Sequence, residues 1–98
     1  MTRVEESAPG VISLSGELLF GSVMSVRAEL ETLLSRQEGS CQLDLGGVTR
    51  VDSSALALWL AGCRKARRDG IELSIANLPA DLKAIADLVG LDGALSQA

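Results

Sequence analysis

The stretch from Val48 to Trp59 constrains the fold most, because it has the pattern of a strand-to-helix corner. The alternating apolar run Cys41–Leu45 and a glycine pair, Gly46-Gly47, come before it. A helix-like run follows it as far as Asp69. Strands that lead directly into helices are the building units of α/β proteins, so the corner predicts that class.

An acid and two hydroxyls stand where this helix should begin, namely Asp52, Ser53 and Ser54. Such side chains cap helices because their oxygens accept the free N–H groups of the first turn. They therefore predict a helix start at Ser53 or Ser54. The same position can also contact an anion, a partner or a kinase, since a helix start presents unpaired N–H groups and partial positive charge. Capping alone and capping combined with a surface site both remain open.

The rest of the chain continues the alternation of strands and helices. Ala8-Pro9-Gly10 is a turn signal that can join the first two strands as a hairpin. Strands are expected over residues 2–7, 11–15, 41–45 and 71–75, and helices over 23–37, 53–69 and 79–89. Strand–helix–strand units favour parallel pairing, so we predict one α/β domain over residues 1–98 in the order β-β-α-β-α-β-α. Its mixed sheet should have about four strands, with three helices mainly on one face.

Composition excludes several kinds of site. The chain has no histidine, which removes the commonest general base and metal ligand near neutral pH. The two cysteines, Cys41 and Cys63, are far apart and form no CxxC pattern. They are therefore expected to be free thiols in a reducing compartment, and no metal or cofactor site is predicted.

Charge and hydropathy limit the partners. A net charge of −4 gives little support to nucleic-acid binding. The basic cluster Arg64–Arg68 is expected to complement the dipole at the end of its helix, with a supporting role in docking as the alternative. Neither a signal peptide nor an apolar run of about 20 residues is recognisable, so a cytoplasmic protein is expected, with any membrane link through a partner.

Catalysis finds no support in the sequence. Sequence motifs of nucleotide-binding, hydrolase and metalloprotease sites are absent. A serine nucleophile at Ser53 or Ser54 would need Lys65, Lys83 or a carboxylate as its base. Lys65 lies about three helical turns away, too far to reach back. Asp44 and Asp52 are better explained as a strand-end acid and a helix cap. We therefore expect a non-enzymatic protein.

The first turns of the corner helix carry more apolar residues than one face can hold. Leu56 to Leu60 are five apolar residues in succession, and they cannot all point the same way. At least one of Leu58 and Trp59 should therefore be exposed in the isolated domain, where it would form a binding patch. The alternative is a wholly structural role. The predicted partner-binding residues are Asp52, Ser53, Ser54, Leu56, Leu58 and Trp59.

Three segments together resemble the STAS domain, the fold of the anti-sigma factor antagonists. They are Val11–Leu18 (VISLSGEL), Leu43–Leu45 (LDL) and Val51–Leu56 (VDSSAL), and the resemblance covers essentially the whole chain. In regulatory members a partner kinase phosphorylates the second serine of an acid-Ser-Ser-Gly-Leu motif. The resemblance implies that Ser54 is this phosphoacceptor, although Ala55 stands where glycine is usual.

The corner and the end of the chain look most like the STAS subunit of the Mla phospholipid-transport ABC system. The similar segments are Leu56-Ala57-Leu58, Ala76–Leu82 and Leu88–Leu91. This resemblance implies an accessory subunit that binds the cytoplasmic ATPase and supports its assembly and activity, with Ser53 as the contact hydroxyl. Such a subunit would help to maintain outer-membrane lipid asymmetry, and it would be held peripherally at the inner membrane through the ABC complex. The alternative is an anti-sigma factor antagonist that binds a serine kinase/anti-sigma factor and is switched at Ser54.

Overall fold

The computed structural model describes residues 2–95, apart from the side chains of residues 92 and 94. The expected order of strands and helices is confirmed, with one additional helical turn at the end. The elements are β1 (Arg3–Ala8), β2 (Val11–Leu18), α1 (Val23–Leu34), β3 (Ser40–Val51), α2 (Ser53–Arg68), β4 (Glu72–Ala76), α3 (Ala80–Leu88) and α4 (Asp92–Leu95).

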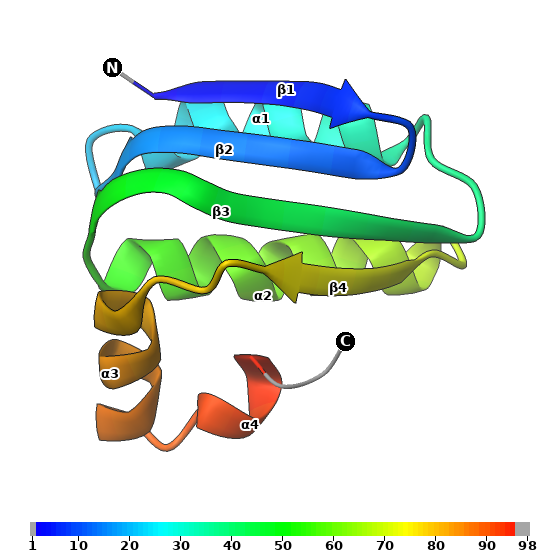
Figure 1. Ribbon diagram of the computed structural model, residues 1–98. Helices are drawn as coiled ribbons and strands as arrows, with labels where there is room; N and C mark the ends of the chain where they lie inside the picture. Colours follow the sequence, from blue (N-terminus) through cyan, green and yellow to red (C-terminus); the bar gives the residue numbers. More distant parts are fainter. Residues whose placement is uncertain (1, 96–98) are drawn as a thin grey trace.

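The four strands form one mixed sheet in the order β1-β2-β3-β4. β1 and β2 are an antiparallel hairpin, whereas β2–β3 and β3–β4 are parallel pairs joined through α1 and α2. Figure 1 shows α1 and α2 side by side against one face of the sheet, with α3 and α4 beyond its β4 edge. The predicted α/β fold with helices mainly on one face is therefore confirmed. No helix within residues 2–95 is both long enough and apolar enough to cross a membrane.

The hydrophobic core lies between the sheet and the two long helices. Alternating residues of β2, β3 and β4 point into it, while their polar neighbours face the open side of the sheet, and β1 contributes only the partly buried Val4. Its largest fully buried side chains are Ile12, Leu14, Leu18, Leu30, Leu34, Leu43, Trp59 and Leu82.

Both central strands are longer than predicted. β3 does not end at Leu45 but passes through Gly46 and Gly47 to Val51. A side chain at Gly47 would place its Cβ only 2.7 Å from the Cβ of Ser15, so this glycine permits a close approach of β2 and β3 rather than a turn. β2 likewise continues beyond Ser15 to Leu18, which brings the start of α1 close to the start of α2.

The helix ends differ from the prediction in two places. α1 ends at Leu34 rather than about Gln37, because the chain tightens there into turns in which the Gln37 N–H donates to the carbonyl of Leu34. The last helix was predicted to include Val89, but α3 ends at Leu88; Leu82 and Ala86 are buried in it, whereas Val89 is 58% exposed. Beyond α3, Leu95 is buried, whereas Leu91 is 40% exposed.

Candidate functional site

Asp52 caps α2 and fixes its first turn. It has extended backbone angles (φ −131°, ψ −171°) between β3 and α2. Its Oδ1 accepts a hydrogen bond from the backbone N–H of Ser54 at 2.9 Å and a second, short one from the Ser54 hydroxyl. The predicted helix start at Ser53 is thereby confirmed, and the Ser54 side chain is engaged by the cap.

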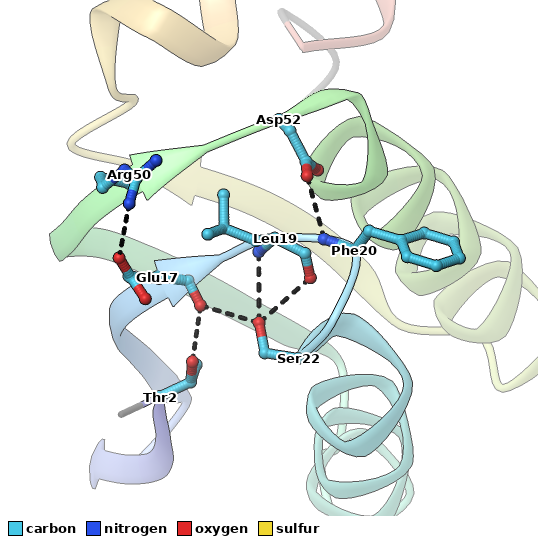
Figure 2. Close-up of polar contacts among 7 residues, drawn as sticks. All are labelled: Thr2, Glu17, Leu19, Phe20, Ser22, Arg50 and Asp52. Atoms are coloured by element: carbon cyan, nitrogen blue, oxygen red, sulfur yellow. Dashed lines mark hydrogen bonds and ion pairs between the residues drawn. The ribbon is translucent and has the colours of Figure 1, made fainter.

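The other oxygen of Asp52 holds the loop between β2 and α1. The backbone N–H of Phe20 donates to Oδ2 at 2.9 Å, which joins two segments 32 positions apart in the sequence (Figure 2). The Ser22 hydroxyl secures the other end of the loop, at 3.0 Å from the carbonyl oxygen of Glu17, and accepts from the N–H of Leu19 at 3.2 Å. Ser22 stands at the start of α1, but its side chain does not cap the helix because its hydroxyl serves this loop instead.

The tethered loop presents two large apolar side chains to the surface. Phe20 is 82% exposed and Met24, on the first turn of α1, is 74% exposed. Figure 2 shows the Phe20 ring pointing away from the polar network that holds its backbone. Together with Ser54 and Ala57 of α2, both side chains line a shallow groove of about 210 Å³. An exposed apolar patch of this kind marks an interaction surface.

Sequence reasoning missed Phe20 and Met24. For each of them the sequence contained a weak indication of exposure. Phe20 is the only phenylalanine and falls in the segment expected to be a loop, where an apolar ring has little reason to be buried. Met24 lies off the apolar line formed by Val23, Val26 and Leu30 on the predicted helix.

The expectation that Leu58 or Trp59 is exposed is wrong. Leu58 is 3% and Trp59 2% exposed, and Leu56 is also buried. The reason is that α2 packs against the sheet, α1 and α3 at once, so most of its circumference is covered. These three side chains fix α2 in the core and do not form an exposed patch. The other three predicted site residues do reach the surface: Ser53 is exposed, and Asp52 and Ser54 are half-buried.

The exposed side of α2 is a single narrow strip. Its members recur at helical spacing and occupy about a third of the circumference. They are Ser53, Ala57, Arg64, Arg67 and Arg68. The strip therefore begins with a hydroxyl at the helix start and ends with three arginines in the last turns.

Hydrogen bonds stabilise the charged form of Asp52. The Ser54 hydroxyl, followed by the N–H groups of Phe20 and Ser54, lowers the pKa of this carboxyl below its usual range. Hydrogen bonds from Asn77 and from the N–H of Gly46 likewise lower the pKa of Asp44, on the open side of the sheet. Both aspartates are therefore ionised at neutral pH.

The lowered pKa of Asp52 predicts a pH-dependent part of the stability. This contribution is fully present above the pKa of Asp in the unfolded chain, about 3.9. It is lost as the pH falls through the lower pKa that Asp52 has in the folded protein. Asp52→Asn keeps a capping oxygen but not the charge. Urea unfolding of both proteins should show the native protein as the more stable at pH 7, with the difference shrinking below about pH 4. Both proteins keep Asp44, so the effect of its titration cancels in the difference between their stabilities. A difference in stability that stays constant with pH would show that the charge of Asp52 contributes nothing.

The arrangement offers no activated nucleophile. The Nζ of Lys65 pairs with Asp69 at 2.8 Å and that of Lys83 with Asp87 at 3.2 Å, so neither amine serves Ser53 or Ser54. The carboxylate beside Ser54 is a weak base, since its pKa is lowered. Burial raises the pKa of both free thiols, Cys41 and Cys63, which keeps them protonated. Among the described residues, no group of three or more acidic or cysteine side chains could hold a metal ion.

Solved structures share this fold. An anti-sigma factor antagonist from Mycobacterium paratuberculosis matches with a TM-score of 0.71 at 21% sequence identity, over 98% of this chain and 82% of the other. The unphosphorylated anti-sigma factor antagonist SpoIIAA matches with a TM-score of 0.67 at 16% identity, over 90% and 83% of the two chains. A sulfate transporter family protein from Wolinella succinogenes matches with a TM-score of 0.67 at 18% identity, over 94% and 76%. At these identities the likeness establishes the fold alone.

Sequence comparison identifies the family. No curated protein has a significant sequence match to the chain. The profile of the MlaB STAS domain, in contrast, matches residues 1–97. Members of this family are typically regulatory or accessory domains that bind other proteins. The match spans nearly the whole chain, so the protein belongs to the MlaB-type STAS domain family.

Proposed function

We propose that this protein is a non-enzymatic accessory subunit of an Mla-type ABC phospholipid transporter. It binds the cytoplasmic ATPase, supports assembly and activity of the complex at the inner membrane, and thereby helps to maintain outer-membrane lipid asymmetry. Contact is made through a docking surface that consists of Phe20, Met24, Ser53, Ser54 and Ala57. The observation that carries the proposal is that two exposed apolar side chains, Phe20 and Met24, lie beside the capped start of α2 in a chain of the MlaB family.

The geometry of the docking surface supports a protein partner rather than a small substrate. The groove of about 210 Å³ is shallow and mostly apolar. Of its polar groups, the Ser54 hydroxyl is engaged in the cap and Arg27 is paired with Glu31. Its backbone is fixed by Asp52, so little conformational freedom is lost when a partner binds. Ser53 is exposed at the edge of this surface and its side chain is not used in the cap, which suits a direct contact.

Co-purification with the ATPase and permease tests the proposal. Ser53→Arg places a long charged side chain at the edge of the docking surface, where it would obstruct the contact, and we expect it to abolish both co-purification and the ATPase activity of the complex. Gln42→Arg introduces the same side chain at an exposed position on the opposite face of the sheet and should leave both unchanged. Retention of an active complex by Ser53→Arg would contradict the proposal.

A second candidate function rests on the Ser54 hydroxyl. This group donates to the Asp52 carboxylate at the start of α2. Phosphorylation would replace the donor with a dianion beside that carboxylate, and the repulsion would disturb both the cap and the Phe20 tether. The protein would then be an anti-sigma factor antagonist that a serine kinase/anti-sigma factor releases by phosphorylation. Ser54→Asp should abolish binding to such a partner, and no mass shift after incubation with the kinase and ATP would count against this function.

A further inference from the structure

The groove between α1 and α2 continues from the docking surface toward a cluster of arginines. Beyond Ala57 it opens into a depression of about 350 Å³, lined by Arg27, Glu31, Ala61, Arg64, Arg67 and Arg68. Arg27 lines both this depression and the apolar groove beside Phe20, so the two lie next to each other. The combined channel has an apolar end at the start of α2 and a basic end near its last turns.

The basic end carries unbalanced positive charge. Its single acid, Glu31, is paired with Arg27 at 3.4 Å. Within residues 2–95, no ion pair joins Arg64, Arg67 or Arg68 to a carboxylate. The chain as a whole has a net charge of −4, so this local excess stands out against an acidic surface. A helix C-terminus accounts for cations in the last turn, but not for Arg27, which lies on the other helix and faces the same depression.

We propose that this channel binds an acidic amphipathic segment of the docked partner. The inference rests on the proposed function, because the segment belongs to the protein that contacts Ser53. An apolar side chain of the segment lies between Phe20, Met24 and Ala57. Carboxylates that follow it pair with Arg64, Arg67 and Arg68. From Ala57 to Arg68 the strip spans about 16 Å, which matches about ten residues of helix or five of extended chain.

Charge and shape favour a peptide over an extended polyanion. A membrane surface or a nucleic acid presents negative charge over a wide area, which the acidic remainder of this chain would repel. The arginines lie in a depression between two helices, with buried Ala61 in its lining, and a single chain segment fits there better than a flat surface does. The apolar end also requires an apolar side chain next to the acids, which a peptide supplies.

A peptide titration tests the inference without the ATPase. The probe is a fluorescein-labelled synthetic peptide with a leucine-rich half followed by a glutamate-rich half, and fluorescence anisotropy measures its affinity. Arg64→Glu should weaken binding about tenfold, because an attraction becomes a repulsion, and added salt should weaken it as well. Arg3→Glu makes the same change of net charge on the exposed β1 strand and should leave the affinity unchanged. A peptide with lysine in place of glutamate should bind more weakly than the probe.

Three results would overturn the inference. They are absence of probe binding, equal weakening by Arg64→Glu and Arg3→Glu, and Arg64-dependent sedimentation with phosphatidylglycerol vesicles in place of peptide binding. The last of these would assign the arginines to a lipid surface. Failure of the channel is distinguishable from failure of the proposed function. If Ser53→Arg disrupts the ATPase complex while the probe does not bind, only the channel inference fails.

Discussion

Replacement of Trp59 by alanine is expected to lower the free energy of unfolding by about 3–5 kcal/mol. Trp59 is 2% exposed and is among the largest fully buried side chains of the core, so its removal leaves a cavity under α2. Since domains of this size are stable by about 5–15 kcal/mol, the variant should lose a large part of its free energy of unfolding. Urea unfolding followed by circular dichroism measures the change.

Trp59→Phe is the control for this prediction. It keeps an aromatic side chain in the same space, so it should be clearly more stable than Trp59→Ala. The result also decides the role of Trp59. If Trp59→Ala keeps its stability but loses the partner, Trp59 is a contact residue, and its placement in the core is wrong.

Replacement of both Phe20 and Met24 by serine is expected to weaken partner binding by a factor of 30 or more, at a cost of about 2 kcal/mol or more of binding energy. Both side chains are largely exposed, so the free energy of unfolding should change by no more than about 0.5 kcal/mol. Titration of the purified protein into the ATPase by calorimetry gives the affinity, and urea unfolding gives the stability.

Leu88→Ser is the matched control for the Phe20 and Met24 pair. Leu88, at the end of α3, is 87% exposed, so the substitution removes an equally accessible apolar side chain from a different surface. The affinity of this variant should equal that of the native protein. If Leu88→Ser weakens binding and the serine pair does not, the docking surface lies at the end of α3 instead.

The parts of this protein that sequence reasoning predicted depend on local chemistry. The cap at Asp52 and Ser54 is formed by residues two positions apart, and side-chain type alone indicates it. The turn at Pro9-Gly10, the alternation in β4 and the order of elements follow in the same way from propensity and periodicity. The mixed sheet then follows from the hairpin and the two strand–helix–strand units.

The parts that were missed depend on neighbours distant in the sequence. Five successive apolar residues in α2 suggested an exposed side chain. In the structure α1 and α3 cover the apolar side chains of α2 that do not face the sheet. The extension of β3 through Gly47 depends on the close approach of Ser15, which no local pattern encodes. Phe20 became part of the site only because its backbone reaches Asp52, 32 positions away.

Hydrogen–deuterium exchange of the protein, free and in complex with the ATPase, tests the central claim most directly. The backbone N–H groups of the β2–α1 loop and of the first turns of α1 and α2 should exchange more slowly in the complex, because the docking surface consists of these segments. Exchange in β1, an edge strand that contributes no residue to the docking surface, should be unchanged. Protection confined to β1 or α3, with the loop at Phe20 and the start of α2 exchanging as in the free protein, would contradict the claim.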